Sequence, residues 1–161
     1  MAAYTTIDNS ELYFQAQLFS GNGTSASSTQ SITFDDTDTD LQPNMLWIKC
    51  RTGSEDHVLS DSVRGDSGAS SGFYELRPDT TQASGSGSYN GLITALNSDG
   101  FSVGNNDVVN TNTEPYVAWA WKETATAGFD MLTYSGNSTN RTISHSLSAV
   151  PHFIFATNRT G

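Results

Sequence analysis

Apolar and polar residues alternate in short runs along this chain, and the runs predict β-strands. They lie at 15–19, 30–34, 45–49, around Val58 and Leu59, at 73–76 and at 116–121. No window shows the 3.6-residue apolar period of an amphipathic helix. Because strand signals recur every ten to fifteen residues or so, the pattern predicts an all-β, antiparallel sandwich of seven or more strands, jelly-roll or concanavalin-like.

Turn-forming residues separate the runs. The stretch SGNGTSASS at 20–28 predicts a hairpin turn between the first two strands, since Asn and Gly tolerate positive φ. NSDG at 97–100 predicts a second hairpin, between Leu92–Leu96 and Phe101–Val103. Residues 66–89 are rich in Ser and Gly and predict a long surface excursion.

The run YVAWAW at 116–121 separates large side chains from small ones. Val117, Trp119 and Trp121 share one face of the predicted strand, and Tyr116, Ala118 and Ala120 share the other. One face should therefore pack in the core and the other lie close to a neighbour. Core packing is the favoured interpretation of Trp47, Trp119 and Trp121; sugar stacking on exposed rings is the alternative.

A stretch near the start of the chain recurs near its end. Phe14–Gly53 opens with FQAQLFSGNGT and closes with QPNMLWIKCRTG, whereas Phe129–Gly161 opens with FDMLTYSGNST and closes with VPHFIFATNRTG. The period suits tandem domains. We predict a docking arm at 1–13, a sandwich domain at 14–122, and a linker with an incomplete second copy of the module at 123–161.

The incomplete copy carries two further expectations. About 40 residues without a disulfide or metal seldom bury enough surface to fold alone. We therefore expect this half module to pack on the first domain or on neighbouring subunits, and the native chain to run on beyond Gly161.

Charge and composition narrow the function. The 161 residues carry a net charge of −10 with only seven Lys and Arg, which disfavours binding to nucleic acid or to anionic membranes. The eight Phe, six Tyr and three Trp favour a folded β protein over disorder. Cys50 has no second cysteine to pair with, so we expect a protein assembled in a cytoplasm.

Candidate chemistry is sparse. His57, Asp61 and a serine would supply the residue types of a Ser/His/Asp triad, but serines are so abundant that such a set arises by chance, and a surface histidine at a strand end is favoured. The acidic run Asp35–Asp40 resembles a calcium loop without the glycine and glutamate of an EF-hand, so a solvated loop is favoured over a weak calcium site. No catalytic, cofactor or metal residues are assigned.

Arg64, Gly65 and Asp66 spell the integrin-binding tripeptide. We interpret this as coincidence. The better interpretation is structural: Asp61 and Arg64 form a partly buried ion pair that fixes the end of their strand.

Six short motifs follow one another along the chain: SGNGT, QPNMLWIKCR, HVLSDSVRG, LITALNSDGFSVGNN, EPYVAWAWKE and GFDMLTYSGNST. In this order they resemble a tandem domain of tail-fibre-like virion structural proteins of marine tailed bacteriophages. Two positions depart from that family: Ser60 stands where a large residue is usual, and an insertion lies around residues 79–89. The resemblance implies a β-sandwich in a homotrimeric fibre, with no catalytic residues to carry over.

The resemblance predicts a virion structural protein rather than an enzyme. It would be the virion-proximal part of a tail fibre, anchored to tail or baseplate proteins and assembled in the host cytoplasm. A head fibre or capsid-decorating protein, or a lectin-like glycan-binding module, are the alternatives. A polysaccharide depolymerase is disfavoured, because no periodic carboxylate pairs occur.

Overall fold

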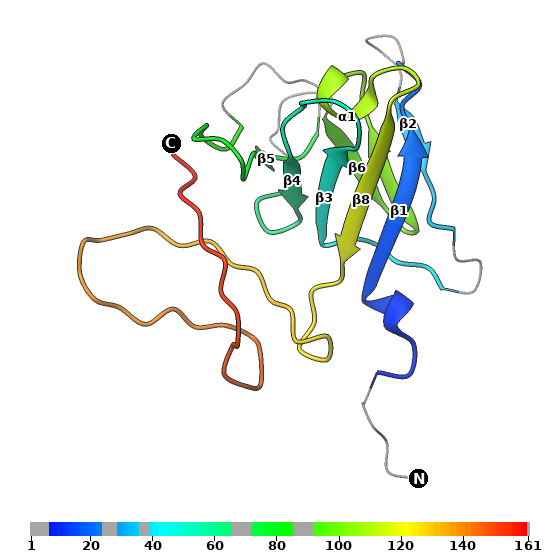
Figure 1. Cartoon of the computed structure of the whole chain (residues 1–161). Helices are drawn as coiled ribbons and strands as arrows, with labels where there is room; N and C mark the ends of the chain where they lie inside the picture. Colours follow the sequence, from blue (N-terminus) through cyan, green and yellow to red (C-terminus); the bar gives the residue numbers. More distant parts are fainter. Residues whose placement is uncertain (1–6, 24–28, 36–38, 66–71, 86–91, 161) are drawn as a thin grey trace.

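The computed structural model describes residues 7–23, 29–35, 39–65, 72–85 and 92–160, and it contains two antiparallel sheets packed face to face (Figure 1). Its strands are β1 (Phe14–Ser20), β2 (Gln30–Ile32), β3 (Met45–Cys50), β4 (Val58–Asp61), β5 (Glu75–Leu76), β6 (Ile93–Asn97), β7 (Gly100–Val103) and β8 (Pro115–Trp121). Two single turns of helix accompany them, η1 (Ser10–Leu12) and α1 (Asp107–Asn110). The predicted antiparallel sandwich is confirmed.

Strand β8 is the organising strand of the larger sheet. That sheet has the order β1-β8-β3-β4-β5, and the smaller one has the order β2-β7-β6. Trp121 pairs with Phe14 of β1 on one side and with Met45 of β3 on the other. β1 and β3 therefore do not pair with each other, and β8, the last strand of the domain, lies between them and pairs with both.

Of the two predicted hairpins, one is confirmed and one is wrong. β6 and β7 pair antiparallel, and Asn97 lies opposite Gly100. β1 and β2 do not pair with each other, because β1 pairs with β8 and β2 with β7. Turn residues predict that the chain reverses, but they do not say which sheet receives the next strand. Residues 24–28 of that connection lie outside the described residues.

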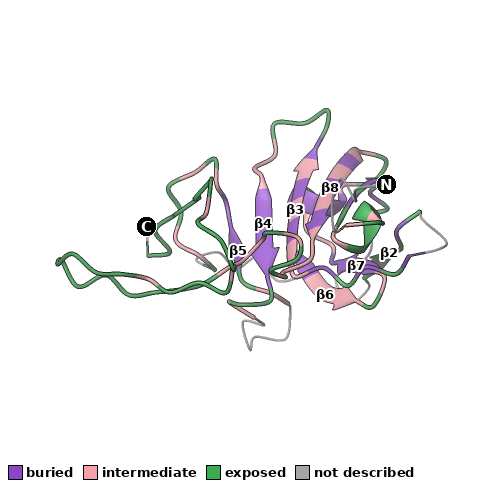
Figure 2. Ribbon diagram, turned by 90° about the horizontal axis from the view of Figure 1, so that it is seen from below, coloured by how far each residue is buried: buried purple, intermediate pink, exposed green. Residues whose placement is uncertain are grey.

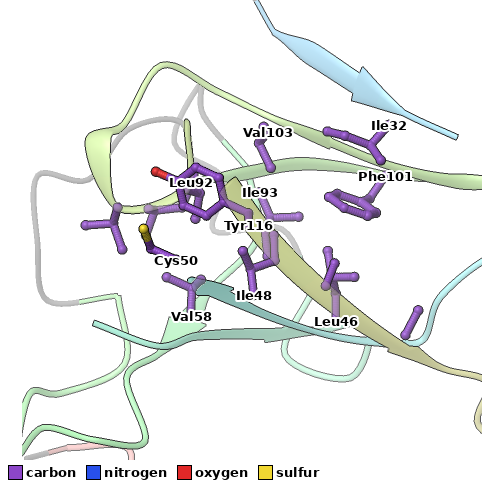
Figure 3. Packing of buried hydrophobic residues seen from close by; sticks show 14 of the residues in the cluster. Ile32, Leu46, Ile48, Cys50, Val58, Leu92, Ile93, Phe101, Val103 and Tyr116 are labelled. Atoms are coloured by element: carbon purple, nitrogen blue, oxygen red, sulfur yellow. The ribbon is translucent and has the colours of Figure 1, made fainter. Parts of the chain in front are cut away.

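The core lies between the two sheets (Figure 3), and Val108 and Val109 of α1 belong to it. Its buried residues are Ile32, Phe34, Leu41, Leu46, Ile48, Cys50, Val58, Leu92, Ile93, Phe101, Val103, Val108, Val109, Tyr116, Ala118 and Ala120. The core side of β8 is thus the side of the small residues, and the tryptophans are not in this cluster. The expected core packing of Trp47, Trp119 and Trp121 is wrong, because small side chains on a central strand leave room for large ones from the facing sheet.

Ser60 is a polar residue on the core side of its strand. Its side chain lies on the core side of β4, next to Leu46 in the register, and is fully buried. Among the described residues its hydroxyl has no hydrogen-bond partner. A buried hydroxyl without a partner lowers stability, so this position is a local weakness of the core.

The single helical turn α1 connects the end of β7 to the start of β8. Asn106 caps it by accepting a hydrogen bond from the Val108 amide at 3.0 Å. The Tyr116 hydroxyl donates to the Asp107 carbonyl and accepts from the Thr111 amide, both at 2.9 Å. Burial raises the pKa of Tyr116, as expected for a phenol that serves a structural role.

The residues after β1 contact the last residue of α1 and the residue that follows it. The Asn22 amide donates to Asn110 Oδ1 at 2.8 Å, and Asn110 Nδ2 donates to Asn22 Oδ1 at 3.2 Å. Gly21 lies so close to this segment that a Cβ placed there would be 2.1 Å from the Thr111 carbonyl oxygen. Only glycine fits at Gly21 without moving the backbone.

Part of the predicted N-terminal arm contacts the sandwich. Asn9 Nδ2 donates to Thr39 Oγ1 at 2.7 Å, and the Tyr13 carbonyl accepts from the Lys122 amide at 2.8 Å. Residues 7–13 are therefore held against the domain. Residues 1–6 of the arm lie outside the described part of the chain.

The predicted second copy is extended and exposed (Figure 2). Within residues 123–160, all of which are described, the only β pairing is the single bridge between Thr124 and Phe129. One backbone hydrogen bond returns to the loop beyond β5, from the Ser84 amide to the Arg159 carbonyl. Packing on the first domain, one of the two expected alternatives, is therefore wrong for most of its length, whereas packing on neighbouring subunits stays a prediction.

Candidate docking surface

The outer side of the larger sheet carries an apolar surface that we call the aromatic face. Cross-strand register places its residues in three rows on β1, β8 and β3. The rows are Phe14, Trp121 and Met45; Ala16, Trp119 and Trp47; and Leu18, Val117 and Lys49. Directly opposed residues of a sheet point to the same side, so these side chains form one continuous surface.

The edge strand β1 contributes to this face with inverted polarity. Gln15 and Gln17 point inward and are buried, whereas Phe14 is 41% exposed and Leu18 is 58% exposed. The buried amides are hydrogen-bonded: Gln15 Nε2 donates to the Thr39 carbonyl at 3.2 Å, and Gln17 Oε1 accepts from the Asp35 amide at 3.1 Å. An edge strand that faced water would carry the opposite pattern, so the face has the composition of an interface.

The tryptophans are half-buried because they pack on one another. The Trp47 and Trp119 rings meet edge to face at 6.1 Å, and Trp47 Nε1 donates to His57 Nδ1 at 2.9 Å. Phe14 lies 5.1 Å from Trp121. These contacts hold the rings in fixed positions, which lowers the entropy cost of burying them against a partner.

One end of the face opens into a small apolar cavity. Its volume is about 270 Å³ and its lining includes Ile7, Tyr13, Trp121 and Phe129. Phe129 stacks on Trp121 with a ring separation of 6.3 Å. The second copy thus begins against the aromatic face.

The edge of the larger sheet formed by β4 and β5 carries buried charged residues. Arg64 Nε binds Asp61 Oδ2 at 2.6 Å, which confirms the predicted ion pair. The Arg64 side chain is only 3% exposed, so it is not displayed as an integrin motif would be, and Asp66 lies outside the described residues. A second pair, Arg77 with Asp56, fixes the neighbouring loop.

Glu75 adds a third carboxylate to this charged edge. It is buried opposite Ser60, and burial raises its pKa above the ordinary value of 4.5 despite the nearby Arg77 and Arg64. The folded state therefore binds this proton more tightly than the unfolded state. The group's contribution to stability is complete below the unfolded pKa and is lost as pH rises through the folded pKa.

We predict that Glu75→Gln removes this loss. Between about pH 4 and about pH 7, the free energy of unfolding should fall less, or rise more, in the variant than in the wild type. Urea denaturation at a series of pH values measures the difference. Glu55→Gln, at a half-buried carboxylate of the preceding loop, is the control for removing a charge. Parallel pH curves for Glu75→Gln and wild type would contradict the prediction.

The other candidate sites do not assemble into chemistry in the described residues. His57 binds Trp47 and Asp61 binds Arg64, so the two do not form the hydrogen bond of a triad. In the described ranges no three His, Cys, Asp or Glu side chains gather as metal ligands. Asp36 and Asp38 of the candidate calcium loop lie outside those ranges. No described helix has the length and apolarity needed to cross a membrane.

The fold is an all-β sandwich, and the outer side of its larger sheet is apolar. The chain belongs to the family described as Domain of unknown function (DUF7483), whose model matches residues 9–161. That range includes both the sandwich and the exposed second copy. The searches of curated proteins and of solved structures each found no match.

The aromatic face is the feature that sequence reasoning missed. Its signal is present in FQAQLFS, where Phe14, Ala16 and Leu18 alternate with Gln15 and Gln17. The alternation identifies the two sides of a strand, but it does not say which side faces the core. Choosing the side with the larger side chains as the core side of β8 gave the wrong answer.

Proposed function

We propose that this protein is a virion structural protein, the virion-proximal part of a phage tail fibre that anchors the fibre to the tail or baseplate. The ordered motifs that resemble tail-fibre-like proteins support the assignment. The structural observation that carries it is the inverted polarity of β1, which presents Phe14 and Leu18 outward at the edge of the larger sheet. A protein that works by assembly needs such a surface.

The partner at the aromatic face is a second copy of this chain, and the assembly is a homotrimer. Lys49 is the one charged residue of the face, although the chain as a whole carries a net charge of −10. Copies therefore meet with little repulsion at this surface, whereas their acidic remainder keeps other contacts apart. Burying each large apolar side chain contributes about 1.5–3 kcal/mol.

The remaining assignments follow from the same proposal. Residues 1–13 dock to tail or baseplate proteins, and the protein resides in the virion tail after assembly in the host cytoplasm. The role is not enzymatic and uses no cofactor. The acidic surface is suited to protein partners rather than to nucleic acid or membranes.

Leu18→Lys tests the copy-to-copy contact. We expect the assembly to dissociate to monomers, because a charge enters an apolar interface, while monomer stability changes by no more than about 0.5 kcal/mol at this exposed site. Sedimentation velocity gives the oligomeric state. Val63→Lys, at an exposed apolar residue in the turn after β4, is the matched control and should leave assembly unchanged. An oligomer that survives Leu18→Lys would rule out this interface.

The place in the particle needs a separate experiment. Negative staining of particles lacking the gene product should show tails without fibres, and tails with fibres would contradict the assignment. Copy number distinguishes the head-fibre or capsid-decorating alternative: a few trimers mark the tail, and many copies over the shell mark the head.

The position of the tryptophans favours one further alternative, a lectin-like module. Trp119 and Trp121 lie on the outer side of the sheet and are partly exposed, so a sugar ring could stack there. Binding on a glycan array that disappears in Trp119→Ala, with the fold retained by circular dichroism, would support this alternative. If no glycan binds, the tryptophans serve assembly alone.

A further inference from the structure

The exposed second copy repeats the residues that the first copy uses to hold β8. By the sequence match, residues 129–135 correspond to β1 and residues 153–158 to β3. Gly136 and Asn137 correspond to Gly21 and Asn22. The two copies can therefore be compared contact by contact.

In the first copy, these residues contact a single later segment. β8 pairs with all of β1 from Phe14 to Ser20 and with all of β3 from Met45 to Cys50. Gly21 lies against the Thr111 carbonyl, and Asn22 exchanges hydrogen bonds with Asn110. The common partner is the segment 104–121, which contains α1 and β8.

In the second copy, the same residues lack these contacts. A Cβ at Gly136 would meet no atom within 4 Å, so no described neighbouring residue of this chain requires a glycine at this position. Asn137 Oδ1 accepts hydrogen bonds from Thr139, two residues away. Phe153 is 83% exposed and Ile154 is 77% exposed. The second copy therefore keeps the glycine, the asparagine and the apolar residues that contact segment 104–121 in the first copy, but no described segment of this chain packs on them in the same way.

The second copy also keeps the two-sided pattern of the first. Tyr134, Ile154 and Ala156 take the positions of Phe19, Leu46 and Ile48, which face the core. On the other side, Phe129 and Phe155 take the positions of Phe14 and Trp47 on the aromatic face. Two strands with this pattern can flank a third one, as β1 and β3 flank β8.

We infer that residues 129–160 form an acceptor for a β-strand of the β8 type. The occupant inserts antiparallel between 129–135 and 153–158, with small residues toward the core side and large ones outward. An Asn-Thr turn precedes it and packs on Gly136 and Asn137. A second copy of this chain is not the donor, because its β8 is already bound between its own β1 and β3. The inference rests on the repeat and not on the proposed function.

The test supplies such a segment from this chain itself. Because Gly161 corresponds to Gly53, residues 54–122 can be repeated directly after Gly161, which provides counterparts of β4 to β8. Hydrogen exchange followed by mass spectrometry should show backbone amides in 129–135 and 153–158 exchanging at least about 100-fold more slowly than in the unextended chain. Unchanged exchange would overturn the inference.

Gly136→Ala separates a specific acceptor from general compaction. In the unextended chain it should leave the melting temperature unchanged, because no atom lies near the added methyl group. In the extended chain it should abolish the protection, since Gly21 shows that a Cβ there meets a carbonyl oxygen at 2.1 Å. Protection that survives Gly136→Ala would overturn the proposed geometry.

Two further substitutions test the predicted sides of the strand. Ile154→Asn, at a core-side position, should also abolish protection in the extended chain, whereas Thr157→Asn, at the position equivalent to Lys49, should leave it intact. Equal effects of the two would contradict the proposed arrangement. Protection that appears in the unextended chain as its concentration rises would identify a second copy as the donor and overturn the choice of occupant.

Discussion

Asp61→Ala is expected to lower the free energy of unfolding by about 3–5 kcal/mol, because it leaves the buried charge of Arg64 without its partner. Burial lowers the pKa of Arg64, and the Asp61 carboxylate opposes that shift. The carboxylate also accepts the Arg64 amide at 2.8 Å, so the substitution removes a turn contact as well. Guanidinium denaturation of the wild type and the variant measures the loss.

Two controls separate burial from charge. The Asp61 side chain is 11% exposed, whereas Asp56, the partner of Arg77, is 33% exposed. Arg64 and Arg77 are about equally buried, but water can replace the more exposed Asp56 carboxylate, and Asp61 alone of the two also accepts the backbone amide of its arginine, so Asp56→Ala should cost less. The double variant Asp61→Ala with Arg64→Met should recover most of the stability, since it removes the unpaired charge. If the double variant is as unstable as Asp61→Ala, the loss comes from packing and not from electrostatics.

Gly100→Ala is the second substitution for which we expect a large effect. Gly100 has φ +107°, and a Cβ there would lie 2.0 Å from the Ile32 carbonyl oxygen. Alanine would thus strain the backbone and push β7 away from β2. We expect at least about 3 kcal/mol of destabilisation, as for strain at a special backbone position combined with a disrupted core.

Gly128 provides the matched control, because it has φ +69° and a Cβ added there would meet no atom within 4 Å. Gly128→Ala should cost only the conformational term, about 1 kcal/mol. Thermal unfolding of both variants measures the difference. Equal effects would show that backbone conformation, and not the contact with β2, decides the cost at Gly100.

The strands were predictable because each is a local pattern of alternating residues. The ion pair of Asp61 with Arg64 was predictable for the same reason, since its partners are three residues apart. The pairing of the strands was not predictable. β1 and β2 are close in sequence yet lie in different sheets, because β1 pairs with β8, about 100 residues later, and β2 pairs with β7. Alternation does not encode which distant strand arrives.

The candidate site was only partly predictable. Sequence periodicity places Trp119 and Trp121 together on one side of β8, and the structure agrees. The assignment of that side to the core failed, because it assumed that the largest residues are the most buried. In this sandwich Phe101, from the facing sheet, fills the core, so the small Ala118 and Ala120 suffice on the inner side of β8. Which side faces inward depends on the opposite sheet, which β8 does not specify.

The central place of β8 also governs how the domain folds. Phe14 cannot reach its partner Trp121 until nearly the whole domain has been synthesised, and β1 and β3 stay unpaired with each other throughout. Such long sequence separations between contacting residues slow folding, typically to milliseconds or seconds in all-β domains. During translation, the apolar strands β1 and β3 are therefore exposed together until the last strand emerges. Because of this strand order, the larger sheet can form only when β8, the last strand of the domain, pairs with β1 and β3.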